Sequence, residues 1–307
     1  MRPEAVTLLL LVVATAVAIR LSPFFADVGY ILESATYYTE FSVVALVLTV
    51  VIISGEIDLS PASMMALSAC LFAVSFRAGA PVPLAMVVSL LSGLAMGLFN
   101  AMLVVALRLP SIIVTIGTLT LYRGVAQVLV GDHSIGGFPE WFVGIDYRTL
   151  GIVPVPILIL AVFTIVLAVY LGRTIHGRQV YQVGTNEVAA RHAGVQVGRI
   201  KFGLFLASGL VSAAAGLMMA SRLGTVRYDL ASGGELQMVL IAMLGGTYIY
   251  GGRGTILGTF LASWLLVIIA TGMTVANVPI NAQLTVLGLL LIVSIIATNA
   301  IYSRSTR

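Results

Sequence analysis

Charged side chains are scarce in this sequence, and their scarcity decides the class of protein. Only 9% of the 307 residues are Asp, Glu, Lys or Arg, whereas 60% are hydrophobic and the mean hydropathy is +1.10. Soluble domains carry roughly 25% charged residues, because polar side chains must cover their surface. A soluble globular fold is therefore excluded, and we expect an integral membrane protein.

Residues that commonly carry catalytic or metal chemistry are also few. The single cysteine, Cys70, excludes a disulfide framework, and the three histidines (His133, His176, His192) show no metal-ligand spacing. The sequence has no Walker A lysine motif, no G-x-S-x-G elbow and no H-E-x-x-H motif. We expect no enzyme activity, no metal site and no cofactor bound by this chain.

Basic residues outnumber acidic ones, and nearly all of them are arginine. The net charge is +4, and Lys201 is the one lysine. In a membrane protein this excess is typical of cytoplasmic loops and does not indicate nucleic acid. With the N-terminus inside, ten Lys and Arg residues, including Arg2 and Arg307, fall on the cytoplasmic side and five on the external side. We therefore expect both termini in the cytoplasm.

Apolar stretches predict an all-α, polytopic helix bundle with about ten transmembrane helices in one domain. The expected spans are 6–22, 40–54, 61–79, 83–107, 110–131, 152–172, 201–222, 236–250, 254–272 and 282–301. The first could instead be a cleaved signal peptide. Polar loops are expected at 23–38, 132–151 and 173–200, and the last would separate a first half, about 1–172, from a second half, 201–307.

Two of these spans are short and run into polar, glycine-containing breaks. Segments 40–54 and 236–250 have about 15 residues, or ~22 Å of helix, against a hydrocarbon core of ~30 Å. Paired broken segments in two related halves, here a parallel repeat offset by about 200 residues, point to a transport pathway. The alternative is an ordinary turn at the membrane surface in each case.

The two breaks carry charges of opposite sign. Glu56 and Asp58 lie in the first break, next to Ser60-Pro61, which is typical of an N-cap and first helical residue, and Arg253 lies in the second. These charges could pair across the protein. They are candidates for function only if they lie inside the membrane.

Small residues recur at helical spacing in two expected spans. Gly93 and Gly97 form one small-xxx-small pattern, and a longer series follows in 201–222: Gly209, Ala213, Gly216 and Ala220. Such patterns let transmembrane helices pack closely. They indicate a bundle and say nothing about a substrate.

The loop 173–200 contains one expected short helix, at 186–193. Thr185 or Asn186 would cap its start, Glu187 suits its first turn, and Gly194 would end it. A short helix with apolar and charged groups could dock into a groove of a soluble partner, or it could lie on the lipid surface.

Several motifs together resemble the permease subunits of bacterial ABC importers for ribose-type sugars and autoinducer-2. The family signature G-G-I-D-L-S-x-G-S is similar to residues 55–63, although Glu56 and Pro61-Ala62 depart from it. Further similar segments are Asn100, 110–118, 122–124, the G-x-N-x-x-A-A-x-x-x-G stretch at 184–194, 244–247 and 251–255. The resemblance covers nearly the whole chain.

The resemblance implies a translocation subunit of the bacterial inner membrane that works with other proteins in the lipid bilayer. Its partners would be a separate ATPase that binds ATP, a second permease subunit in a homodimer or heterodimer, and a periplasmic sugar-binding protein. Residues implied for the substrate pathway are Glu56, Asp58, Ser60, Asn100, Thr115, Arg123, Gly246 and Arg253. Residues implied for coupling to the ATPase are Gly184, Asn186, Glu187, Ala189, Ala190, Arg191 and Gly194.

Two alternatives belong to other mechanistic classes. An ion-coupled secondary transporter would use Glu56, Asp58 and Arg253 as coupling residues. An intramembrane enzyme is disfavoured by the missing catalytic motifs. The solute stays open between rhamnose, autoinducer-2, ribose and another small polyol.

Overall fold

A computed structural model describes residues 3–304 of the chain; Arg2 and Arg307, counted above for orientation, lie outside them. Within these described residues, eight helices are long and apolar enough to cross a membrane. Two shorter apolar helices, α3 and α11, complete the ten segments expected from the sequence. The ten are α1 (Pro3–Leu21), α2 (Val28–Ile53), α3 (Pro61–Arg77), α4 (Val82–Ala101), α5 (Ser111–Val130), α7 (Val155–Arg173), α10 (Val197–Leu223), α11 (Gly234–Leu244), α12 (Ile256–Val275) and α13 (Ile280–Arg304).

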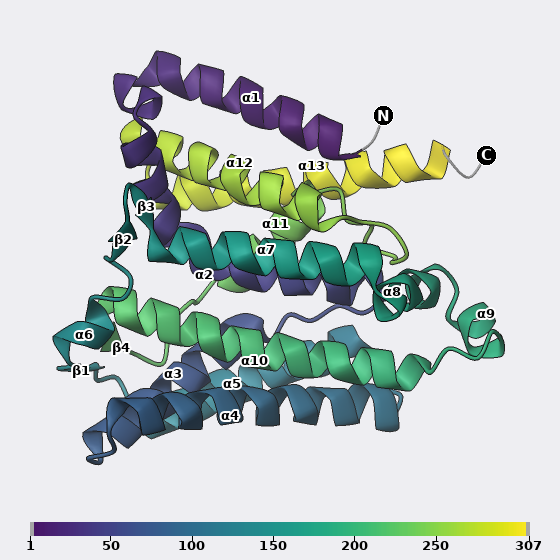
Figure 1. Ribbon diagram of the computed structural model, residues 1–307, viewed down its shortest axis with the longest axis horizontal. Helices are drawn as coiled ribbons and strands as arrows, with labels where there is room; N and C mark the ends of the chain where they lie inside the picture. Colours follow the sequence, from purple (N-terminus) through teal and green to yellow (C-terminus); the bar gives the residue numbers. More distant parts are fainter. Residues whose placement is uncertain (1–2, 305–307) are drawn as a thin grey trace.

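Short elements gather at the two ends of this bundle (Figure 1). At one end lie α8 (Ile175–Thr185) and α9 (Glu187–His192), near the start of α1 and the end of α13. At the other end lie α6 (Glu140–Val143) and two antiparallel strand pairs. The pairs are β1 (Ile135–Gly136) with β4 (Thr225–Val226), and β2 (Thr149–Leu150) with β3 (Val153–Pro154). A 3₁₀ turn, η1 (Pro23–Ala26), precedes α2, and a π-helical turn, η2 (Met102–Ala106), extends α4.

The prediction of a polar loop at 23–38 is wrong for most of its length, because α2 begins at Val28. The Asp27 carboxylate caps the helix by accepting the Gly29 N–H at 2.8 Å. The hydroxyls of Thr36 and Thr39 donate to backbone carbonyls one turn earlier, and Glu40 is paired with Arg222. Polar side chains satisfied in this way fit inside a bundle, so the first short span is in fact a 26-residue helix.

The second short span is shorter than expected. Helix α11 has 11 residues, or ~16 Å, and ends at Leu244, after which residues 245–255 run without helix to α12. The loop 173–200 is more ordered than expected, since α8 precedes α9. Thr174 caps α8 by accepting the Gly177 N–H at 2.9 Å, and Val180 and Val183 anchor its inner face.

The bundle packs around α3, which is buried along most of its length between α4, α5 and α10. Small residues allow this close packing, as predicted. A Cβ on Gly93 would overlap the Gly209 carbonyl oxygen, and a Cβ on Gly216 would lie 2.5 Å from the Met65 carbonyl oxygen. The helices therefore meet through their backbones at these positions.

Candidate functional site

The two predicted breaks meet each other, together with the end of α8. The Gly252 N–H donates to the Ile53 carbonyl at 2.8 Å, joining the second break to the end of α2. A Cβ on Gly184 would overlap that same Ile53 carbonyl oxygen. A Cβ on Gly251 would lie 2.8 Å from the Gly55 Cα, and both residues have positive φ. We call these four residues (Gly55, Gly184, Gly251, Gly252) the glycine junction.

From the glycine junction the first break continues into the protein as a non-helical segment, 54–60. The Asp58 carboxylate accepts hydrogen bonds from the Ser60 N–H (3.0 Å), the Ser60 hydroxyl (2.6 Å) and the Ser208 hydroxyl (2.7 Å). All three side chains are buried. Pro61 is the first residue of α3, as predicted, but the Ser60 side chain donates to Asp58 and does not cap the helix.

Helices α4 and α5 extend this polar cluster. The Asn100 amide donates to the Ser60 hydroxyl at 2.9 Å, and the Tyr122 hydroxyl lies 3.0 Å from the Asn100 side-chain oxygen. Thr115 donates to the Ile57 carbonyl at 3.2 Å, and the Ile57 N–H donates to the Ser111 hydroxyl at 3.1 Å. The backbone N–H and carbonyl of Ile57, which lie outside any helix, are thus satisfied by protein groups, as burial in a membrane requires.

The depth of the first break follows from its contact with α10. Ser208 is eleven residues beyond Val197, the start of that 27-residue helix, and therefore ~16 Å along it. Residues 58–60 consequently lie level with the middle of a membrane-spanning helix. This position along α10 argues against an ordinary surface turn for residues 58–60 of the first break.

The predicted pairing of Glu56 or Asp58 with Arg253 is wrong. Glu56 pairs with Lys201 of α10 at 2.5 Å. The Arg253 guanidinium lies over the Tyr302 ring, 4.9 Å from its centroid, on α13. Glu56 in the first break thus has Lys201 as its partner, and Arg253 in the second break has Tyr302. The charges of the two breaks do not pair with each other.

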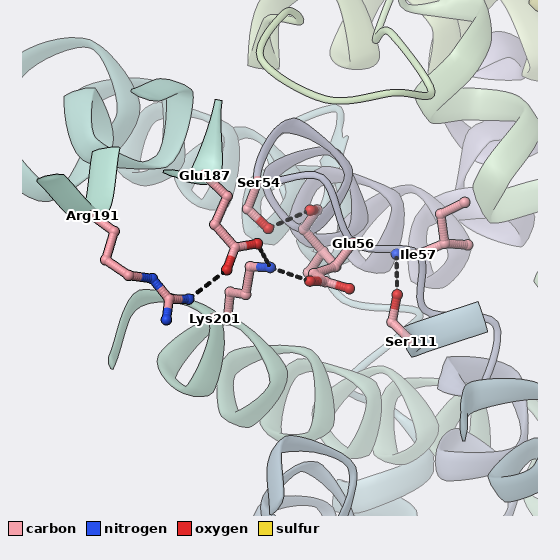
Figure 2. A network of polar contacts seen from close by, with 8 residues as sticks. Ser54, Glu56, Ile57, Ser111, Glu187, Arg191 and Lys201 are labelled. Carbon is pink, nitrogen blue, oxygen red and sulfur yellow. Dashed lines mark hydrogen bonds and ion pairs between the residues drawn. The ribbon is translucent and has the colours of Figure 1, made fainter. Parts of the chain in front are cut away.

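Lys201 also reaches α9, as Figure 2 shows. Its Nζ lies 2.7 Å from a carboxylate oxygen of Glu187, whose other oxygen lies 2.7 Å from Arg191. The hydrogen bond from Lys201 lowers the pKa of Glu187, outweighing the effect of partial burial. A chain of alternating charges thus runs from the exposed side of α9 to the first break.

Helix α9 has the predicted form. Asn186, and not Thr185, caps it by accepting the Ala189 N–H at 2.9 Å, and Gly194 follows its end with φ +84°. Ala190 is buried against α8 and α10, whereas Val188 is 66% exposed. Gly184, also implied for coupling, lies in α8 and belongs to the glycine junction, so it is not part of α9.

Besides Arg253, two implied pathway residues lie away from the Asp58 cluster. Arg123 donates from one guanidinium nitrogen to the carbonyls of Tyr228 (2.9 Å) and Leu230 (2.6 Å), which holds the loop between β4 and α11. Gly246 has φ +83°, and its carbonyl accepts the Tyr302 hydroxyl at 3.1 Å. Both therefore shape loops at opposite ends of α11.

Sequence reasoning missed three residues of the site: Ser208, Tyr122 and Lys201. Ser208 directly precedes Gly209, and it was missed because the small residues of this segment were interpreted only as helix-packing positions. Tyr122 lay in a recognised motif without an assigned role. Lys201 could have been found as the one lysine of the chain, seven residues before Ser208 and so on the same face of α10.

A second charged cluster lies at the opposite end of the bundle. Glu40 is buried and pairs with Arg222 at 2.7 Å. Asp146 is also buried, and burial raises its pKa to about 6 although the Arg222 charge opposes the shift. This cluster joins α2 and α10 to the loop that follows α6.

Comparison with known proteins places the chain in a family. Residues 30–295 match the model described as branched-chain amino acid transport system / permease component. The chain is 37% identical to the autoinducer 2 import system permease protein LsrD of Klebsiella pneumoniae, over 94% of this chain and 89% of that relative. It is 34% identical to the LsrD protein of Escherichia coli, over 90% and 86%. No solved structure matches the chain.

These relatives are transport permeases, which favours the importer over the ion-coupled transporter and agrees with the resemblance stated from the motifs. Such a family implies an ATPase and a substrate-binding protein as partners in general. The apolar helices and the relatives agree on a multi-pass protein of the inner membrane. This chain belongs to the permease family of branched-chain amino acid transport system components, and it is a permease of the ABC importer type.

Proposed function

We propose that this permease imports a small sugar-like solute of the autoinducer-2 kind. The relatives that cover most of the chain are named for import of autoinducer 2, and the similarity extends through both breaks and α9. The chain itself binds no ATP and catalyses no reaction in this proposal. A separate ATPase binds and hydrolyses ATP, and a periplasmic binding protein selects the solute.

We further propose that α9 is the ATPase docking element and that the end of the bundle carrying α8 and α9 faces the cytoplasm. Both termini then lie on the cytoplasmic side. The observation that carries this proposal is the exposed apolar face of α9 at Val188, flanked by Arg191 and presented beyond the membrane-spanning helices. An exposed apolar residue between charged ones suits the groove of a soluble protein.

The solute pathway, in this proposal, follows the first break between two permease subunits, identical or paired as sisters. Glu56, Asp58, Ser60, Asn100 and Thr115 hold the backbone of that break in place. Arg123, Gly246 and Arg253 fix the neighbouring loops. Closure of the ATPases would rock the halves between inward-open and outward-open states.

Uptake into sealed vesicles tests the proposal. Vesicles containing the permease and its ATPase, with binding protein and autoinducer 2 outside, are expected to accumulate the solute only when ATP is supplied to the ATPase. Uptake driven by a proton or sodium gradient without the ATPase would overturn it. Val188→Glu is expected to abolish ATPase binding, whereas Leu150→Glu, an equally exposed apolar position at the other end, retains it.

A further inference from the structure

The first break is attached to α10 at two points. Glu56 and Asp58, two residues apart in the non-helical segment, both have partners on α10. On α10, residues seven apart lie on the same face. Lys201 forms an ion pair with Glu56, and Ser208, seven residues further on, donates a hydrogen bond to Asp58. The segment therefore lies along one face of α10, held by an ion pair at its outer end and a hydrogen bond at its inner end.

The outer attachment is shared with α9. Lys201 Nζ lies between carboxylates of Glu56 and Glu187, which come from two segments that do not otherwise share a side-chain hydrogen bond in the described residues (Figure 2). The side chains of Lys201 and Glu56 are 13% and 11% exposed, so water screens this pair only weakly. Without the lysine, two carboxylates would face each other across the same space.

The pair borders open space. A cavity of about 670 Å³ lies between η2, the start of α5, α9 and α10, and Glu56, Ser111, Glu187 and Lys201 line it. Ser111 holds the Ile57 backbone on the next residue of the break. The Glu56–Lys201 pair therefore borders open space on this side and not a packed core.

We propose that Lys201 is the positioning residue that passes movement of α9 to the first break. This inference rests on the proposed function, in which the ATPase moves α9. A displacement of Glu187 carries Lys201 and Glu56 with it. Glu56 is two residues from Asp58, which is bonded to Ser208 at the middle of α10.

The first test measures the position of α9 in the permease alone, in lipid nanodiscs. Spin labels replace Val188 on α9 and Leu107 after η2, both exposed, in a Cys70→Ala background that removes the one native cysteine. We expect Lys201→Met to at least double the width of the distance distribution, and Lys201→Arg to keep it. Arg199→Met is the matched control, since Arg199 is an exposed basic residue two positions before Lys201 on α10. Its side chain donates a hydrogen bond to Gln196.

The second test measures ATP hydrolysed per solute imported by the assembled importer. We expect Lys201→Met to raise this ratio at least fivefold while the ATPase still co-purifies. If Lys201→Met does not fold, the neutral variant Glu56→Gln, Lys201→Met, Glu187→Gln avoids facing carboxylates and is expected to give the same rise. Distances or ratios equal to those of Arg199→Met would overturn the proposal. Failure of the wild-type complex to import solute with ATP would instead contradict the proposed function. The nanodisc distances do not depend on that result, because they are measured on the permease alone.

Discussion

The Ser208 hydroxyl donates a 2.7 Å hydrogen bond to the Asp58 carboxylate, although 150 positions separate the two residues in the chain. This bond joins the middle of α10 to a segment that has left the helix between α2 and α3. Asp58 also accepts two hydrogen bonds from Ser60, and Ser60 in turn accepts one from Asn100. One buried carboxylate thus organises the non-helical backbone at the depth of the membrane interior.

Replacing Asp58 by alanine is expected to disrupt transport more than the same change at Asp132. Asp58→Ala leaves the Ser60 N–H and the Ser208 hydroxyl buried without their acceptor, at a cost of about 1–3 kcal/mol each. Asp132 is exposed in a loop. Uptake rates and thermal unfolding midpoints of the two purified variants, compared with wild type, provide the measurement. Similar activity of both variants would mean that Asp58 is dispensable for the break.

Backbone contact between α4 and α10 predicts a sharp difference between two glycines of α10. A Cβ on Gly209 would overlap the Gly93 carbonyl oxygen and lie 2.8 Å from the Gly97 nitrogen, whereas a Cβ on Gly203 meets no atom within 4 Å. We expect Gly209→Ala to destabilise the protein by about 1–3 kcal/mol, as overpacking does. Gly203→Ala should be neutral or stabilising by up to about 1 kcal/mol, because alanine favours helix. Equal unfolding midpoints in detergent would show that the helices separate without cost.

Glycine at the junction of the two breaks predicts a local effect on function. A Cβ on Gly184 would overlap the Ile53 carbonyl oxygen, which accepts the Gly252 N–H. Gly184→Ala is therefore expected to break the contact between the breaks and lower uptake at least tenfold, with the chain still inserted in the membrane. Gly172→Ala is the control, because a Cβ there meets no atom within 4 Å. Membrane-fraction abundance and vesicle uptake distinguish the outcomes.

Hydropathy and local capping rules predicted much of this protein, since both act between neighbours in the chain. The ten segments follow from apolar length, and the end of α9 at Gly194 follows from residue type, which left its N-cap open between Thr185 and Asn186. Helix α2 was shortened in the prediction because polar residues such as Thr36 look like loop residues until their partners are known. The Glu56–Lys201 pair joins residues 145 positions apart, and Arg253 offered an equally plausible partner by charge alone.

Burial of Asp146 predicts a pH dependence of stability. Its pKa is about 6 in the folded protein against 3.8 for an ordinary aspartate, so its contribution is greatest below pH 4, falls as pH rises to 6, and is constant above. Asp146→Asn is expected to raise the unfolding midpoint at pH 8, by an amount equivalent to at most about 3 kcal/mol, and the gain should shrink as the pH falls below 6 and vanish near pH 3. Asp132→Asn is the exposed control. A gain independent of pH would contradict the raised pKa.

The end of α9 predicts two variants that separate ATP hydrolysis from transport. Gly194 has φ +84°, which proline cannot adopt, and its N–H donates to the Arg191 carbonyl at 3.1 Å. Ala190 is 5% exposed, so Ala190→Glu would force a charge into the contact between α9 and the bundle. We expect both variants to insert normally and to lose coupled transport. Gly79→Pro is the matched control, because Gly79 also follows a helix with positive φ but lies at the other end of the bundle. Coupled ATPase activity and uptake equal to wild type in Gly194→Pro and Ala190→Glu would show that α9 is not the docking element.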